Sequence, residues 1–416
     1  MGYGDEEKRY HYFRTYYQSK EDVVKQSKLF VVAIAIMAIF ICTQTVSAAD
    51  TIKIGAAYGM TGRIGWIGDD CVNGAKLVIE EINAKGGING KKLELVAYDT
   101  KNNPDSARTI FEKLIKKDKV VAIIGPVITQ ATQTVMPIAE KYKVPYAAVS
   151  GGIQINAKIL PDYKKQGKKS YTWAMSIGTP RQNEVKTIWL QKNGFQKLGN
   201  IEPLSQMGDL STVMYKQWAQ KYGMKVVAKE KFDNKGTDFT TQMSKLKANG
   251  ADCIGTMASG GPAVTLVKNR DQVGMQKAPM MVSDANLSKK FIGLLGENSG
   301  NVYTVGAKIS FPQHLAASDP QKKIIADFQK KFETKYGKGP KSWFFASVGH
   351  DSALMFVKAI EQVGTDGEKI RDWVEGQSQF QGVQAAYSWS ASDHRGIGVD
   401  QCSVLEIKGG DWVPAQ

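Results

Sequence analysis

The feature that most constrains the fold is a regular alternation of short apolar strands with amphipathic helices, which begins at residue 51. Thr51 to Gly55 (TIKIG) predicts a strand, and the glycine-rich loop 59–68 follows it. Apolar residues then recur at three- and four-residue spacing between residues 72 and 82, which predicts a helix that ends at Gly86 and Gly87. We expect Asp69 and Asp70 at the N-terminus of this helix, where carboxylates are favoured.

The same alternation continues through most of the chain. Its first run predicts strands at 92–98, 120–124 and 144–149, with helices that begin at Pro104 and Thr129. A second run begins at Tyr171. It predicts strands at 198–204, 224–230, 252–257, 279–282 and 301–307, helices at 180–193, 210–222, 239–249 and 262–273, a further unit at 286–295, two long helices at about 320–336 and 344–363, and closing strands at 383–389 and 402–407. Alternation of this kind predicts an α/β fold with parallel sheets covered on both faces, and its length accommodates two doubly wound, Rossmann-like lobes.

The N-terminus has the pattern of a secretory signal peptide. Fourteen apolar residues run from Leu29 to Cys42, after two lysines and before the small residues Ser47 to Ala49. The run is short for a membrane span, which makes a permanent anchor the less favoured alternative. We therefore interpret 1–49 as a signal peptide region and the body as extracytoplasmic. Residues 1–28 are unusually long for the region that precedes the apolar run of a signal peptide, and we interpret 1–23 as a misassigned start, with Val24 at the true first codon.

Composition and motifs exclude several classes of function. A formal net charge of +15 is compatible with nucleic acid, anionic membrane or acidic small molecules, but no basic run is interleaved with stacking aromatics, so we expect no nucleic-acid partner. The cysteines and histidines do not form a metal-binding spacing, and the three cysteines of the body allow at most one disulfide. The segment 86–92 lacks the leading glycine and the final Ser or Thr of a phosphate loop, and neither GxSxG nor HExxH occurs. We expect no enzyme activity, cofactor or metal.

Two loops at predicted strand ends are candidates for ligand binding. Gly125 to Ala131 joins an apolar strand to a helix, so the free N–H groups of that helix and the Thr129 hydroxyl suit a carboxylate. The alternative is that Thr129 only caps its helix. Ser150, Gly151 and Gly152 end the next strand, where glycines let a ligand approach the backbone.

These residues resemble a known family, the type I periplasmic solute-binding proteins of ABC transporters for branched-chain amino acids (leucine-binding family). The resemblance covers nearly all of the chain after residue 49 and is carried by Thr61-Gly62, Gly65-Trp66, 81–90, Tyr98-Asp99, Ile124-Gly125, Thr132-Gln133, 144–146, 236–239, Ala353-Leu354 and 394–396. It implies two α/β lobes joined by three hinge crossings, which close over a small ligand and deliver it to a permease with ATPase subunits. We accordingly expect a monomer, with 50–174 and 305–386 in lobe 1 and 175–304 and 387–416 in lobe 2.

The resemblance also implies the ligand-binding residues. They are Trp66, Ile67, Thr129, Gln130, Ser150, Gly151, Gly152, Met207, Ser259 and Asp284. Asp284 would pair with the ligand ammonium. Two departures weaken the case for an α-amino acid, because the family usually has a hydroxyl at Gly152 and an aromatic at Met207. An aromatic or aliphatic carboxylate therefore stays as the rival ligand, and a sensory module for a membrane receptor stays as the rival role.

Overall fold

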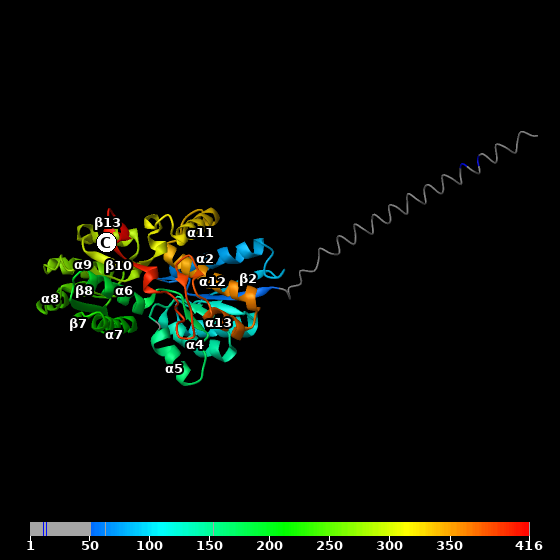
Figure 1. The fold of residues 1–416 in the computed structure, drawn as a ribbon, viewed down its shortest axis with the longest axis horizontal. Coiled ribbons are helices and arrows are strands. Elements are labelled where there is room, and N and C mark those ends of the chain that lie inside the picture. Colours follow the sequence, from blue (N-terminus) through cyan, green and yellow to red (C-terminus); the bar gives the residue numbers. More distant parts are fainter. Residues whose placement is uncertain (1–10, 12–13, 15–50, 63, 153, 416) are drawn as a thin grey trace, which may run out of the picture. The chain divides into compact units, whose positions relative to one another are not determined.

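The first sheet of the protein is five-stranded and entirely parallel (Figure 1). In the computed structural model its strands follow the order β2-β1-β3-β4-β5. They are β1 (Ile52–Tyr58), β2 (Leu93–Asp99), β3 (Ala122–Ile124), β4 (Tyr146–Ala148) and β5 (Thr172–Ala174). The intervening helices are α2 (Gly65–Ala84), α3 (Pro104–Lys113), α4 (Thr129–Tyr142) and α5 (Leu160–Lys165). The predicted parallel βα architecture is confirmed for this part of the chain.

The second sheet has seven strands in the order β14-β13-β10-β9-β8-β6-β7. They are β6 (Lys197–Pro203), β7 (Lys225–Phe232), β8 (Cys253–Gly255), β9 (Met280–Met281), β10 (Val302–Ala307), β13 (Cys402–Lys408) and β14 (Asp411–Pro414). Its helices are α6 (Gly178–Lys192), α7 (Gln206–Lys221), α8 (Thr240–Ala248), α9 (Gly261–Gln272) and α10 (Lys289–Leu295). Pairing is parallel from β7 to β10 and antiparallel from β10 to β14.

The chain returns to the first sheet through three further helices, α11 (Pro320–Tyr336), α12 (Trp343–Val363) and α13 (Gly367–Glu375), and the strand pair β11 (Phe380–Gln381) and β12 (Ala386–Tyr387). Helix α12 packs closely along α2. A Cβ at Gly74 would lie 2.0 Å from the Ala346 carbonyl oxygen, and one at Gly349 would lie 2.0 Å from that of Cys71. Glycine at both positions therefore lets the two helix backbones touch. With this return, the chain passes between the two sheets three times.

Several boundaries differ from those predicted. Strand β10 belongs to the second sheet over its full length, 302–307, so the predicted change of lobe after residue 304 falls inside a strand. Helix α2 begins at Gly65, so Asp69 and Asp70 are not in its first turn as predicted. Asp70 instead accepts the backbone N–H of Ser342 at 2.8 Å, at the start of α12. Burial raises the pKa of Asp70 to about 6, against the opposing effect of these hydrogen bonds.

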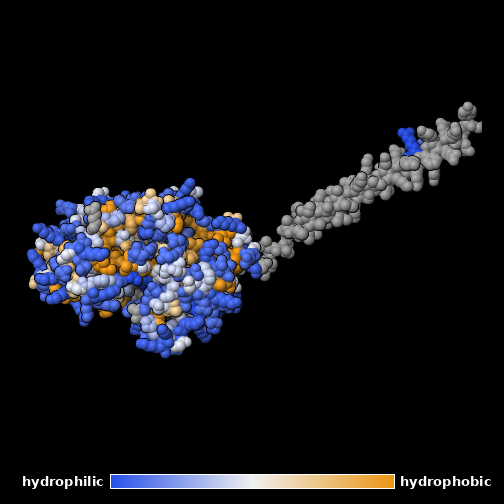
Figure 2. Space-filling view, viewed as in Figure 1, coloured by the Kyte–Doolittle hydropathy of each residue, from blue (hydrophilic) through white to orange (hydrophobic). Residues whose placement is uncertain are grey.

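The structure describes residues 11, 14, 51–62, 64–152 and 154–415. The predicted signal peptide and start codon lie outside these residues, and that interpretation stays a prediction. Within the described chain, Cys71, Cys253 and Cys402 are free, so none of the three forms the disulfide that the sequence allowed. No helix among these residues is both long and apolar enough to cross a membrane. The face shown in Figure 2 is mainly hydrophilic, with hydrophobic residues in separate patches.

Candidate ligand-binding site

The first wall of the site is formed by the two loops that follow β3 and β4. The Thr129 and Ser150 hydroxyls lie 3.0 Å apart, and Ser150 is fully buried. The N-cap of α4 is Ile128, which makes no side-chain capping bond, so the alternative that Thr129 caps its own helix is wrong. The first-turn N–H groups of α4 have no acceptor within the helix, and together with the two hydroxyls they form a surface that suits a carboxylate.

The close approach of Thr129 explains why position 152 is a glycine. A Cβ at Gly152 would lie 2.7 Å from the Thr129 hydroxyl oxygen, closer than such contacts allow. The Thr129 side chain therefore occupies the space that a Cβ at position 152 would need. The carbonyl of the neighbouring Gly151 accepts the Thr179 N–H at 2.9 Å, which ties this loop to the first turn of α6.

The second wall includes Asp284, directly after β9. Its backbone N–H donates to the Gln182 side-chain oxygen at 3.2 Å, and the Ser283 hydroxyl donates to its carboxylate at 3.2 Å. Gln182 follows Thr179 by three residues on α6, so the two face the same side of that helix. The N-terminal part of α6 therefore contacts both the Gly151 loop, through Thr179, and Asp284, through Gln182, which links the two walls.

Behind Asp284 lies a buried pair of charged residues that sequence reasoning missed, Lys186 and Glu202. Both are fully buried. Glu202 accepts hydrogen bonds from the Asn200 amide at 2.9 Å, from the Met257 N–H at 2.8 Å and from the Ser211 hydroxyl. Lys186 Nζ lies 3.6 Å from the Met257 sulfur. The burial of Glu202 could have been suspected from its place in the same apolar strand as Leu198 and Ile201. The burial of Lys186 could have been suspected because it lies four residues before the buried Leu190, on the same face of its helix.

Burial shifts the pKa of every charged group in this cluster. It lowers the pKa of Lys186 to about 8 and raises that of Glu202 to about 7. It also raises the pKa of Asp284, and the charge of Lys186 is the largest influence that opposes this rise. The pKa of Asp284, which is half-buried, therefore depends on the charge of Lys186 inside the lobe.

The remaining predicted site residues have different environments. Trp66 is half-buried and packs edge-to-face against Phe345, with ring centroids 5.5 Å apart. Ile67, predicted to bind the ligand, is buried in the main hydrophobic core. Met207 is half-buried in the first turn of α7, while Gln130 and Ser259 are exposed. The structure thus brings Thr129, Ser150, Gly151 and Gly152 together and links them to Asp284 through α6.

Two cavities open between segments of the two sheets. The larger, about 450 Å³, is lined by Gly152, by Gln133, Met136 and Pro137 of α4, and by Gln206, Asp209, Leu210 and Val213 of α7, among others. The smaller, about 330 Å³, is lined by 154–156, by Pro180, Arg181 and Glu184 of α6, by residues of α7 and by Arg395. Gly152 is the predicted site residue that lines the larger cavity, so this cavity extends the candidate site outward.

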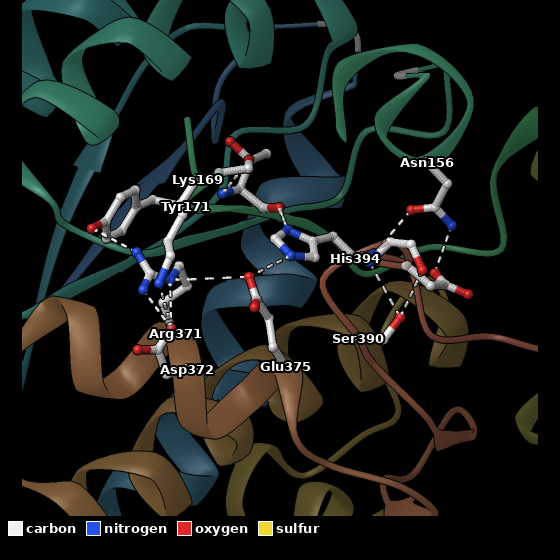
Figure 3. Close-up of polar contacts among 12 residues, drawn as sticks. Asn156, Lys169, Tyr171, Arg371, Asp372, Glu375, Ser390 and His394 are labelled. Carbon is white, nitrogen blue, oxygen red and sulfur yellow. Dashed lines mark hydrogen bonds and ion pairs between the residues drawn. The ribbon is translucent and has the colours of Figure 1, made fainter. Parts of the chain in front are cut away.

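His394 links two of the chain crossings between the sheets by hydrogen bonds (Figure 3). Its ring nitrogens lie 2.8 Å from the Thr172 carbonyl oxygen and 3.1 Å from the Glu375 carboxylate, and its own carbonyl accepts the Ala174 N–H at 3.0 Å. The fully buried ring stacks on Trp173 at 4.7 Å. The crossing from β12 to β13 is thereby bound to β5, where the first crossing begins.

Two α/β sheets, three chain crossings between them, and loops at strand carboxyl ends that offer anion-binding groups define a two-lobed ligand-binding protein. The model of the periplasmic binding protein family matches residues 51–411, and the chain belongs to that family.

Relatives with known names agree with this assignment. The chain is 25% identical over 354 residues to a leucine-, isoleucine-, valine-, threonine- and alanine-binding protein of Pseudomonas aeruginosa, which covers 85% of this chain and 88% of the relative. A type 1 periplasmic binding protein from Bordetella pertussis superposes with a TM-score of 0.72 at 25% identity, over 88% of this chain and 100% of the other. A branched-chain amino acid transporter substrate-binding protein of Streptococcus pneumoniae, solved with isoleucine, superposes at 0.69 with 23% identity over 88% and 100%.

Proposed function

We propose that the protein is the extracytoplasmic substrate-binding component of an ABC transporter, which captures a branched-chain amino acid or a related small hydrophobic carboxylate between its lobes. The observation that carries the proposal is the joining of two walls by α6. One wall offers the Thr129 and Ser150 hydroxyls and the start of α4, and the other offers Asp284. Relatives with names for leucine, isoleucine and valine binding support the same ligand class.

The mechanism we infer is capture by hinge closure. A ligand that contacts both walls stabilises the closed arrangement because it interacts differently with the open and the closed forms. The carboxylate would lie at the start of α4, and the apolar part would contact Trp66 and Met207, which offer large polarizable surfaces. The closed protein would act as a monomer and deliver the ligand to a membrane permease with its ATPase subunits.

A thermal-shift screen tests the proposal. The purified protein is partially unfolded and refolded to remove bound ligand, and its melting temperature is measured with aliphatic amino acids, aromatic carboxylates, short-chain acids and amides. A ligand at about 100 times its dissociation constant should stabilise the fold by about 2.7 kcal/mol. Stabilisation by leucine, isoleucine, valine or another small apolar carboxylate is expected. If no apolar carboxylate changes the melting temperature, the proposal is wrong.

A further inference from the structure

The smaller of the two cavities, about 330 Å³, lies beside the chain crossings, and we call it the hinge cavity. Its walls are the loop 154–156 after β4, helices α6 and α7, and Arg395 in the crossing from β12 to β13. The described residues that line it include none of the predicted site residues. Its apolar lining consists of Ile155, Pro180, Met214 and Trp218. A cavity of this size, with apolar walls and a few polar groups, is typical of a small-molecule site.

Hydrogen bonds hold the walls of the hinge cavity in place. The Trp218 indole N–H donates to the Pro180 carbonyl at 3.0 Å, which joins α7 to the start of α6. The Asn156 amide donates to the Asp393 carboxylate at 2.6 Å, and its oxygen accepts the His394 N–H at 2.9 Å (Figure 3). The loop after β4 is thereby joined to the crossing. The shape of the cavity is therefore set by the fold itself.

The charged residues that line the hinge cavity have an excess of positive charge. Arg181 and Arg395 are cations, and Glu184 is an anion. The Glu184 carboxylate already accepts from the Arg181 guanidinium, from the Lys221 ammonium at 3.2 Å and from the Tyr222 hydroxyl at 2.9 Å. Because these three donors serve Glu184 from within the protein, the carboxylate offers little to a ligand cation. The charge of the cavity favours an anion.

The two arginines have fixed positions at the cavity. Arg395 is 5% exposed, and its guanidinium donates to the Ser176 carbonyl at 2.6 Å. It also fills the space that a Cβ at Gly178 would need, so it lies against the first crossing. Arg181 is 25% exposed and donates to the Ile397 carbonyl at 2.9 Å. A guanidinium has five N–H donors in a planar fork that matches a carboxylate, so two of them at one cavity suit a carboxylate ligand.

We propose that the hinge cavity is a second binding site, for a small organic anion with an aromatic or apolar body, separate from the site of Thr129 and Asp284. In the complex the anionic group contacts Arg181 and Arg395, and the body packs against Trp218, whose ring offers a large apolar surface. This second site goes beyond the proposed function and does not depend on it.

Fluorine NMR of the full protein, labelled with 5-fluorotryptophan and freed of bound ligand, tests the assignment. Trp218 lines the hinge cavity, whereas Trp66 is a predicted residue of the first site, and Trp218→Phe and Trp66→Phe assign their resonances. Sodium benzoate is the probe, and benzyl alcohol, which lacks the charge, is the matched control. Benzoate should shift the Trp218 resonance saturably at millimolar concentrations, and benzyl alcohol should bind there at least 10-fold more weakly.

A pair of isosteric variants separates binding in the cavity from effects at a distance. Gln217→Glu adds a negative charge to the lining at an exposed position, and like charges repel, so benzoate should bind at least 5-fold more weakly. Gln191→Glu adds the same charge at an exposed position near the end of α6, outside the cavity lining, and should leave the affinity unchanged. Circular dichroism and a melting curve confirm that each variant is folded.

Several results would overturn the assignment. Benzoate that shifts the Trp66 resonance and not that of Trp218 binds at the first site alone. Equal affinities for benzoate and benzyl alcohol at Trp218 would show that the cavity does not select an anion. An unchanged benzoate affinity in Gln217→Glu, or no shift of Trp218 at all, would place the probe elsewhere. Each of these results leaves the proposed function intact, because that function concerns the other site.

Discussion

Replacement of Lys186 by Met should make the protein more stable, by an amount that depends on pH. Burial lowers the pKa of Lys186 from its ordinary value of 10.5 to about 8, even with Asp284 and Glu202 nearby. A tenfold change in a protonation constant corresponds to about 1.4 kcal/mol, so the protonated lysine costs the folded state about 3 kcal/mol at pH 7. Methionine has a similar length and no charge, and it removes this cost without leaving a cavity.

The direction of the pH effect follows from the sign of the pKa shift. Between pH 8 and 10.5 the unfolded chain holds more protons on this lysine than the folded chain, so wild-type stability rises with pH in that window. The advantage of Lys186→Met should therefore be about 3 kcal/mol at pH 7 and close to zero near pH 10.5. Urea unfolding of the ligand-free wild-type and variant proteins at pH 7 and pH 10 measures both values. A variant that is less stable than wild type at pH 7, or an advantage that is the same at both pH values, would refute the reasoning.

Three further predictions concern other contacts. Gly152→Ala places a Cβ 2.7 Å from the Thr129 hydroxyl and should cost about 1 to 3 kcal/mol in urea unfolding, whereas Thr129→Ala combined with it should recover most of the loss; equal losses in the two variants would contradict this. Asp351→Ala leaves the buried Val383 N–H, Gln384 N–H and Tyr387 hydroxyl without their acceptor and should cost roughly 3 kcal/mol or more, and a cost below about 1 kcal/mol in the same measurement would argue against it. Burial raises the pKa of Glu140 to about 7, so the folded state holds its proton more tightly and wild-type stability should fall as pH rises from 4.5 to 7; Glu140→Gln should flatten that part of the stability profile, and an unchanged slope would count against the shift.

The sequence predicts the sheets better than the short elements between them. The apolar run ending at Ile124 is correctly predicted as a strand, because a strand buried on both faces consists of apolar residues. Helix α13 was missed although Ile370, Trp373 and Val374 recur at helical spacing and pack into the core, because a helix of nine residues gives only a short apolar pattern. Asp70 was expected at the N-terminus of its own helix, because sequence spacing gives no sign that its side chain accepts the N–H of Ser342 at the start of α12.

The candidate site was predicted in part. The strand-end loops with Thr129 and Ser150 meet as expected, because the carboxyl ends of neighbouring parallel strands share one edge of the sheet. Lys186 and Glu202 were missed because charged residues normally lie on solvated faces, and their burial depends on contacts between distant segments. The electrostatic influence of Lys186 on Asp284 could not be predicted from the sequence, since α6 and the end of β9 are far apart along the chain.

The order of strands in the second sheet has a consequence for how the protein folds. Strand β10 pairs on one side with β9 and on the other with β13, which comes from the last residues of the chain. While a ribosome is still making the chain, the five-stranded sheet can be complete, but β10 keeps an open edge until β13 and β14 emerge. An open edge is a template for pairing with other chains. The second lobe therefore exposes the edge of β10 until the end of the chain is in place, and truncations that remove β13 and β14 should aggregate even though most of both lobes is present.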